Sequence, residues 1–137
     1  MSCLFCQIVL RQVPAHIVFE DALSVAFLDT RPLFHGHCLL VTRAHCETLL
    51  DLPNDDVGPF FQTVQRLVAA IERSLSAQGA FVATNVKVSQ SVPHLHVHIV
   101  PRTKGDGLKG FFWPRKKYRD DDEMAETASR IRRALQP

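Results

Sequence analysis

The sequence predicts an α+β fold with two layers, an antiparallel sheet and one long helix, followed by a C-terminal helix. Three observations support this prediction. Short β-rich runs follow one another early in the chain, apolar residues recur at helical spacing between Val57 and Leu75, and a second helical pattern closes the chain. With 137 residues, 46% of them hydrophobic, the chain can bury one core, and we expect a single domain over residues 1–137.

The first expected elements are short. Apolar residues at positions 4, 5, 8 and 9 predict a helix from Cys3 that ends near Arg11. The β-rich runs 17–20 and 25–29 predict a hairpin. The apolar run 37–41, which follows a loop with proline and glycine, predicts a buried strand.

The long helix carries signals at both ends. Residues 54–56 have side chains that cap helices, and Gly79 is expected to end the helix in the left-handed conformation. Two further strands are expected over 80–86 and 94–101. The C-terminal helix should begin after the acidic run 120–122, which suits the positive end of a helix dipole.

Composition and charge exclude several classes of protein. The formal net charge of +2 is too small to indicate nucleic-acid or membrane binding by bulk electrostatics. No apolar run approaches the roughly 20 residues that cross a bilayer, and the N-terminus lacks a basic stretch ahead of an apolar one. We therefore expect a cytoplasmic protein without a membrane partner.

Histidines alternate strictly with aliphatic residues over 94–99. Residues two apart on a strand share a face, so His94, His96 and His98 should line one side while the aliphatic side chains enter the core. Three imidazoles in register add little to the stability of a strand. The pattern therefore indicates metal binding, catalysis or both.

This stretch resembles the signature of the histidine triad family of nucleotide hydrolases and transferases, His-φ-His-φ-His-φ-φ, where φ is apolar. Further similar segments follow the family in order and spacing: 5–9, 17–21, 26–29, 36–41 and 101–102. The resemblance covers about residues 3–102 and leaves a C-terminal segment, 103–137. It implies a two-layer α+β fold, usually a homodimer with the long helix at the interface, and an enzyme.

The resemblance also implies roles for three histidines. The family joins a nucleoside monophosphate to a histidine nitrogen and then hydrolyses that bond, a task that suits neutral imidazole. His96 would be the nucleophile that attacks the α-phosphorus, and His98 would lie against the phosphate and manage its charge. His37 resembles a supporting active-site histidine, with a hydrogen bond within the core as the alternative.

Other residues resemble substrate contacts. Gln90 and Ser91 match a pair that approaches the phosphates, with turn formation as the alternative, and Asn85 precedes them. The family usually has glycines in this loop; this chain has none, which puts the role of Asn85 in doubt. Asp29 matches a carboxylate that binds both ribose hydroxyls, or it caps a turn. Three apolar residues match the positions that sandwich a purine base, or they belong to the core: Phe5, Ile8 and Phe27.

The N-terminal Cys3-x-x-Cys6 by itself fits zinc, thiol redox chemistry or neither. Bacterial members of the family with this motif bind structural zinc, and the matching further ligands here are His45 and His94. Zinc prefers four such ligands in a tetrahedron, and a closed set leaves no open position for catalysis. The resemblance therefore implies a structural zinc site.

After Arg102, basic residues interleave with aromatic ones up to Arg119. Such a segment can stack bases and bind phosphate, or it can pack at a dimer interface with its charges in solvent. The resemblance favours hydrolysis or nucleotidyl transfer on purine nucleotide phosphoramidates or dinucleoside polyphosphates, without choosing between them. The alternative function is a zinc-stabilised nucleotide-binding or interaction module with little turnover; a zinc protein that binds nucleic acid is disfavoured by the small charge.

Overall fold

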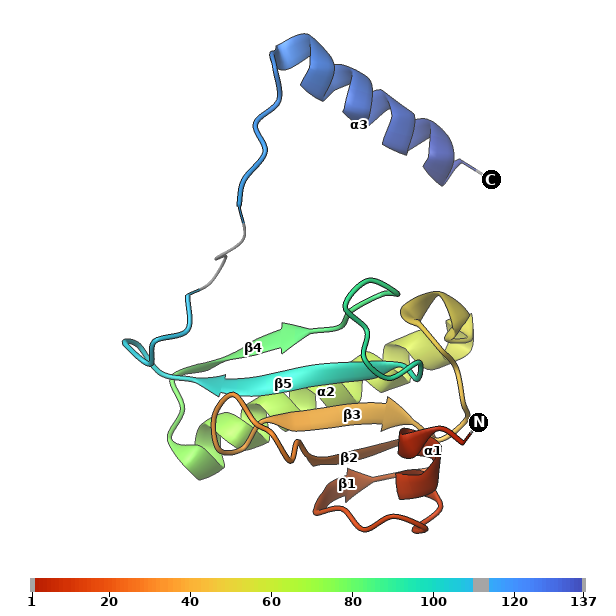
Figure 1. Cartoon of the computed structure of the whole chain (residues 1–137), viewed down its shortest axis with the longest axis vertical. Coiled ribbons are helices and arrows are strands. Elements are labelled where there is room, and N and C mark those ends of the chain that lie inside the picture. The colour runs from red at the N-terminus through yellow and green to blue at the C-terminus, as the bar shows by residue number, and fades with distance from the viewer. Residues whose placement is uncertain (1, 110–113, 137) are drawn as a thin grey trace. The chain divides into compact units, whose positions relative to one another are not determined.

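The computed structural model describes residues 2–109 and 114–136, and its centre is one five-stranded antiparallel sheet with strand order β1-β2-β3-β5-β4 (Figure 1). Every neighbouring pair of strands is antiparallel, which confirms the predicted class of fold. The elements in chain order are α1 (Leu4–Val9), β1 (Ile17–Glu20), β2 (Ser24–Leu28), β3 (Cys38–Thr42), the 3-10 turn η1 (Leu49–Asp51), α2 (Asn54–Leu75), β4 (Gly79–Ala83), β5 (His96–Arg102) and α3 (Asp121–Leu135).

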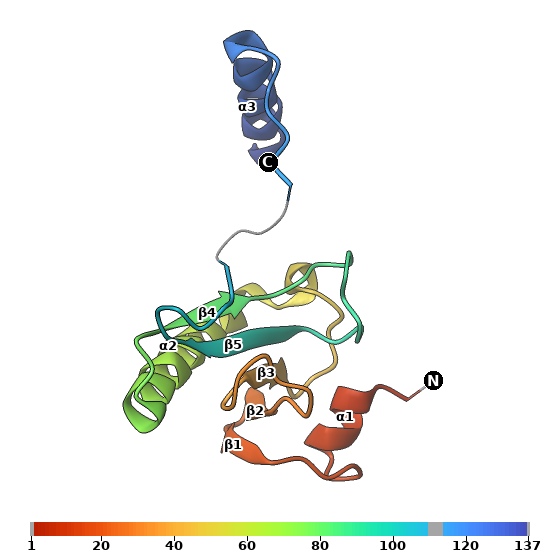
Figure 2. The same cartoon turned by 60° about the vertical axis from the view of Figure 1, so that its left-hand side comes forward.

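The two faces of the sheet carry different side chains. One face packs against α2, with β3 and β5 contributing Leu40, Val97 and Ile99 to a core around Phe60. The opposite face packs against α1, which lies at the β1–β2 end of the sheet (Figure 2). The alternation of β5 sends its aliphatic residues towards α2, and His96 and His98 are therefore left on the side of α1.

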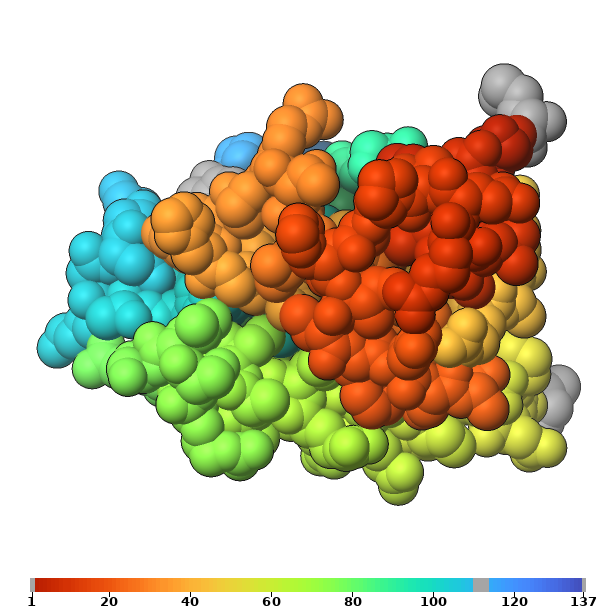
Figure 3. All heavy atoms as spheres, turned by 90° about the horizontal axis from the view of Figure 1, so that it is seen from below, coloured from red at the N-terminus to blue at the C-terminus, as the bar shows by residue number. Residues whose placement is uncertain are grey.

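The loop between β2 and β3 and the N-terminal segment meet on one side of the molecule. In Figure 3 that loop (orange) protrudes beside the N-terminal segment (red). Gly36 lies in this loop with φ of 101°, and a Cβ there would collide with Leu75 Cδ1. Only glycine combines that backbone conformation with such a close approach to α2.

Three predicted boundaries are wrong. β5 begins at His96 rather than His94, because the backbone N–H of Leu95 donates to the carbonyl of Cys46 in a loop. β4 ends at Ala83 rather than at residue 86. The left-handed residue after α2 is Ser76 (φ 54°) rather than Gly79, which is the first residue of β4. The connection between α2 and β4 is short, so the chain has to change direction as soon as the helix ends.

The start of α2 also differs from the prediction. The residue that precedes its first turn is Pro53, whose side chain has no acceptor, so no side-chain cap forms. Asp55 and Asp56 instead lie in the first turn, where negative charge suits the helix dipole.

Residues up to Asp106 form one compact unit and residues from Gly107 form a second. In the second unit, α3 begins where the sequence predicts, with the Asp120 carboxylate accepting from the backbone N–H of Glu123. The aromatic residues at 111–113, on which the stacking interpretation depends, lie outside the described residues. The single domain over 1–137 stays a prediction. No helix in the described part of the chain is long and apolar enough to cross a membrane.

Candidate functional site

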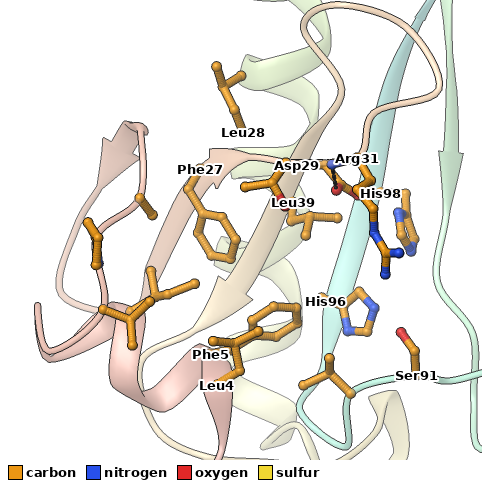
Figure 4. A pocket seen from close by; sticks show the side chains of 16 residues that line it. Leu4, Phe5, Phe27, Leu28, Asp29, Arg31, Leu39, Ser91, His96 and His98 are labelled. Carbon is orange, nitrogen blue, oxygen red and sulfur yellow. Dashed lines mark hydrogen bonds between the residues drawn. The ribbon is translucent and has the colours of Figure 1, made fainter.

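A cavity of about 490 Å³ opens on the α1 side of the sheet. Its walls come from α1 and the loop after it, the end of β2 and the loop after it, the starts of β3 and β5, and the loop before β5. Figure 4 shows that the apolar side chains gather at one end, around Phe5 and Phe27. The polar side chains gather at the other end: Asp29, Arg31, Ser91, His96 and His98.

The apolar end is lined by two aromatic rings and an aliphatic side chain. The rings of Phe5 and Phe27 meet edge to face with their centroids 5.5 Å apart, and Ile8 lines the same wall. All three side chains also belong to the buried cluster under α1. They are therefore core residues and cavity wall at once, so the two interpretations drawn from the sequence do not compete.

Hydrogen bonding fixes which nitrogen of His96 is free. Its Nδ1 lies 2.7 Å from the carbonyl oxygen of His94, and a carbonyl can only accept, so Nδ1 carries the proton. The Nε2 of a neutral His96 ring then keeps its lone pair. The ring is buried and stands edge to face with Phe5, with their centroids 5.0 Å apart.

A chain of two hydrogen bonds orients His98. The backbone N–H of Leu33 donates to Nδ1 of His37 (3.1 Å), so the proton of a neutral His37 is on Nε2. That nitrogen lies 3.0 Å from Nδ1 of His98, to which it donates. His98 therefore carries its own proton on Nε2. We call His37, His96 and His98 the imidazole cluster.

Burial keeps the His37–His98 pair neutral. Desolvation is the main cause that lowers the pKa of His98 to about 4, helped by His96 and His37 and opposed by Asp29. Desolvation also lowers the pKa of His37, again opposed by the nearby carboxylate. At neutral pH both rings are uncharged, so the donor arrangement described above holds.

Asp29 has one oxygen engaged in a turn and one turned towards His37. Its Oδ1 accepts from the backbone N–H of Arg31 at 2.8 Å, which is the turn expected as an alternative from the sequence. Its Oδ2 lies 3.7 Å from Nε2 of His37. The same carboxylate lines the cavity, so it can also accept hydrogen bonds from a bound molecule.

In the loop before β5, Ser91 lines the cavity, whereas neither Gln90 nor Asn85 does. The Gln90 side chain accepts from the Lys87 amide and donates to the carbonyls of Glu47 and Val92. Asn85 donates to the carbonyl of Ser89. These two side chains brace the loop, as the turn interpretation expects for Gln90.

The absence of glycine from this loop has a conformational cost. Lys87 and Ser89 adopt the left-handed region, with φ of 70° and 61°. For residues that have a Cβ this region costs about 1–2 kcal/mol each. The braces provided by Gln90 and Asn85 offset that strain.

Beside the cavity lie two thiols and two imidazoles, which we call the thiol–imidazole cluster: Cys3, Cys6, His45 and His94. Nδ1 of His94 lies 3.3 Å from Sγ of Cys3 and 3.5 Å from Sγ of Cys6. Nδ1 of His45 lies 3.3 Å from Sγ of Cys6. In a tetrahedral zinc site, bonds of about 2.3 Å to sulfur and 2.0–2.1 Å to nitrogen put a sulfur and a nitrogen about 3.5 Å apart. These four residues could therefore hold a metal ion.

The orientation of His94 fits that use. Its Nε2 lies 2.7 Å from the carbonyl oxygen of Thr42, so Nε2 carries the proton and Nδ1 presents its lone pair to the thiols. His94 is fully buried. The cluster joins the start of α1 to the loop after β3 and to the loop that leads into β5.

Comparison with known proteins places this geometry in a family. Residues 10–105 match the HIT domain model. The chain belongs to the HIT family. This confirms the resemblance seen in the sequence, and the HIT motif is the stretch that supplies His94, His96 and His98.

Two HIT relatives carry names that describe an activity. Adenylylsulfatase HINT3 from Arabidopsis thaliana is 30% identical over 141 residues, which cover 98% of this chain and 70% of the relative. Adenosine 5'-monophosphoramidase hnt1 from Schizosaccharomyces pombe is 31% identical over 115 residues, which cover 83% of this chain and 84% of the relative.

One solved structure of a HIT relative is described as zinc-bound. The zinc-bound histidine triad family protein from Mycobacterium smegmatis superposes with a TM-score of 0.75 at 33% identity, covering 95% of this chain and 98% of the other. The likeness supports the fold over almost the whole chain.

Sequence reasoning missed two contributors to the site. The backbone N–H of Leu33 sets the protonation of His37, and no side-chain pattern reports a backbone donor. Arg31 lines the polar end of the cavity. Its position two residues after Asp29, at the start of the loop between β2 and β3, is the signal that could have drawn attention to it.

Proposed function

We propose that this HIT protein is a nucleotide hydrolase or nucleotidyl transferase that acts at the α-phosphate of purine nucleotides through a nucleotidyl-His96 intermediate. The observation that carries the proposal is the free Nε2 of His96, since its Nδ1 proton is donated to the carbonyl of His94. A neutral imidazole with a fixed proton on the far nitrogen is a good nucleophile near neutral pH. It faces a cavity whose other end is apolar.

The substrate would lie along the cavity. The purine would contact Phe5, Ile8 and Phe27, and the free oxygen of Asp29 would accept from the ribose hydroxyls. This places the α-phosphate at the polar end. There His98 and Ser91 line the wall, and donors already held in place stabilise charge that develops on phosphate oxygens.

In the first step the Nε2 lone pair of His96 forms a bond to the α-phosphorus. The bond from phosphorus to the leaving group breaks, and its electron pair goes to the leaving group. The Nε2–H of His98, held by His37, donates to a non-bridging oxygen. In the second step the hydroxyl of water, or of another acceptor, attacks the phosphorus and gives its proton to solvent, and the bond to His96 breaks. The ring then recovers its lone pair, and the nucleoside monophosphate leaves.

The names of the two relatives support an adenosine substrate. One is called an adenylylsulfatase and the other an adenosine 5'-monophosphoramidase. Both names fit cleavage next to an adenosine-bound phosphorus, which is the reaction proposed here. Phosphoramidates and dinucleoside polyphosphates would both fit the mechanism.

We further propose that Cys3, Cys6, His45 and His94 bind one structural zinc ion. Two thiolates and two imidazole nitrogens are a ligand set that zinc prefers, and all four positions are filled by protein. When bound, the metal would tie α1, and with it the wall that contains Phe5, to the start of β5. The homodimer that the family resemblance implies is part of the same proposal.

The test replaces the nucleophile. His96→Ala should lower turnover of adenosine phosphoramidate and of dinucleoside polyphosphates by at least about a thousandfold, because in the proposed mechanism His96 supplies the bond-forming atom. Binding of AMP, measured by calorimetry, should persist because Phe5, Asp29 and His98 remain. The matched control is His35→Ala, an exposed histidine outside the cavity.

Two outcomes would contradict the proposal. Comparable turnover in His96→Ala would mean that water attacks the phosphorus directly. Binding of AMP by a wild-type protein with no turnover on any substrate would favour the nucleotide-binding module instead.

A further inference from the structure

Arg31 lies at the polar end of the cavity, and its charged side chain forms no ion pair with any described residue. Among the described residues that line the cavity, it is the one lysine or arginine. Its backbone N–H is bound by Asp29, but its guanidinium makes no hydrogen bond or ion pair with the described residues. In Figure 4 the guanidinium points towards the end of the cavity that carries His98 and His96.

The base of this side chain is held in place although its end is exposed. The turn closed by Asp29 Oδ1 fixes the amide of Arg31, and Pro32 after it restricts Arg31 to extended backbone conformations. The guanidinium can therefore reach the polar end from a defined starting point. An exposed arginine whose charge is not paired by any described residue is available to an anion at the polar end of the cavity.

The direction from which His96 attacks the phosphorus determines where the leaving group lies in the cavity. His96 Nε2 approaches the α-phosphorus from the buried side, and the leaving group of an in-line displacement departs on the opposite side. The apolar end is assigned to the base and Asp29 to the ribose. The leaving group therefore departs at the polar end of the cavity, where Arg31 is exposed.

We propose that Arg31 binds the leaving group and selects substrates whose leaving group is an anion, such as a polyphosphate or sulfate. This inference rests on the proposed function. When the phosphorus–oxygen bond breaks, its electron pair goes to the departing oxyanion, and a guanidinium stabilises that added charge without transferring a proton.

An amine leaving group has the opposite requirement. The nitrogen of a phosphoramidate must gain a proton as its bond to phosphorus breaks, and a guanidinium does not give up a proton in proteins. Arg31 can thus assist oxyanion departure but not amine departure. Polyphosphate and sulfate share this chemistry, and separate substrates distinguish them.

The experiment compares Arg31→Ala and Arg31→Lys with wild type on three substrates: diadenosine tetraphosphate, adenylyl sulfate and adenosine 5'-phosphoramidate. We expect Arg31→Ala to lower kcat/KM about tenfold or more for an anionic leaving group and less than twofold for the phosphoramidate. Arg31→Lys should recover part of the loss. A loss confined to one of the two anionic substrates identifies which anion Arg31 binds.

Two results would overturn the inference. An equal loss on all three substrates would mean that Arg31 binds the α-phosphoryl group itself, and no loss on any would mean that it does not contact substrate. Arg73→Ala is the matched control for charge, because Arg73 lies on α2, outside this cavity. It should leave all three rates unchanged.

Failure of the proposed function can be told apart from failure of this inference. If the wild type turns over none of the substrates, the proposed function fails, and binding then tests Arg31 alone. ADP places its β-phosphate where the leaving group would lie, so wild type should bind ADP more tightly than AMP. Arg31→Ala should lose that difference while AMP affinity stays the same; an unchanged preference for ADP would overturn the inference.

Discussion

The thiol–imidazole cluster and the imidazole cluster are built from neighbouring histidines that are held in opposite ways. In the first, His94 donates its Nε2 proton to the carbonyl of Thr42 and presents Nδ1 to the thiols. Two residues later, His96 donates its Nδ1 proton to the carbonyl of His94 and keeps Nε2 free. Backbone carbonyls thus select which nitrogen of each ring can react.

This difference explains how one short motif can serve two purposes. A nitrogen that faces two thiols suits a metal, whereas a nitrogen that faces an open cavity suits a phosphorus atom. His94 lies just before β5, where the backbone pairs with a loop, and His96 opens the strand. The change in backbone pairing therefore coincides with the change in the reactive nitrogen.

The largest expected effect is the loss of stability when a ligand of the thiol–imidazole cluster is replaced. Purified protein should carry about one zinc ion per chain, and Cys6→Ser or His45→Ala should lose it. A structural zinc site contributes folding free energy on the order of several kcal/mol, so both variants should melt at clearly lower temperature. His96→Ala should keep its zinc, as measured by elemental analysis, and because it removes a buried ring its melting temperature should fall less than those of the two ligand variants.

Cys46→Ser is the matched control for the metal, since Cys46 follows His45 but is not one of the four residues that lie together. It should retain zinc. If purified protein carries no metal, or if a chelator leaves the melting temperature unchanged, the thiol–imidazole cluster is not a structural metal site. The proposed distinction between the two clusters would then fail.

A smaller effect concerns His98, which the proposed mechanism uses as a donor rather than as a nucleophile. His98→Ala should lower kcat by about a hundredfold, the usual loss when one fixed donor to a developing oxyanion is removed. This loss is smaller than the one expected for His96→Ala. A loss as large as that for His96→Ala would mean that His98 takes part in bond formation.

The lowered pKa of His98 also predicts a dependence of stability on pH. An unfolded histidine titrates near pH 6.5, while His98 in the fold titrates at about 4, so the unfolded chain binds more protons between these values. Its contribution to the free energy of unfolding is present above pH 6.5 and is lost as pH falls towards 4. Urea unfolding between pH 4.5 and 7.5 measures this.

Metal release at low pH would also destabilise the protein, so the comparison is between wild type and His98→Ala at each pH. The variant should lose less stability than wild type on acidification, because one depressed pKa is gone. His37, His96 and Asp29 face the same ring and remain in both proteins. Parallel curves for the two proteins would contradict the lowered pKa.

Periodicity and motif spacing were enough to predict the sheet, α2, α3 and the grouping of histidines on one side of β5. Those features depend on residues close in sequence. The start of β5 could not be predicted, because it depends on the carbonyl of Cys46 in another part of the chain. The helix end at Ser76 similarly depends on how soon the chain must return to the sheet.

Within the candidate site, side chains were easier to predict than backbone groups. The four members of the thiol–imidazole cluster were named from the resemblance, and the structure brings them together. The protonation of each ring was not predictable, since it depends on the carbonyls of Thr42 and His94 and on the amide of Leu33. These are positions in space rather than residue types.

The most direct test of the central claim is a rapid-quench experiment with an adenosine substrate that is labelled at the α-phosphate. If Nε2 of His96 attacks the phosphorus, wild-type protein should retain the label as an acid-labile adduct, and peptide mapping under alkaline conditions should place it on His96. His98→Ala should form the same adduct more slowly, and His96→Ala should form none. Turnover by wild-type protein without any labelled adduct at the shortest quench times, or a label on another residue, would contradict the claim.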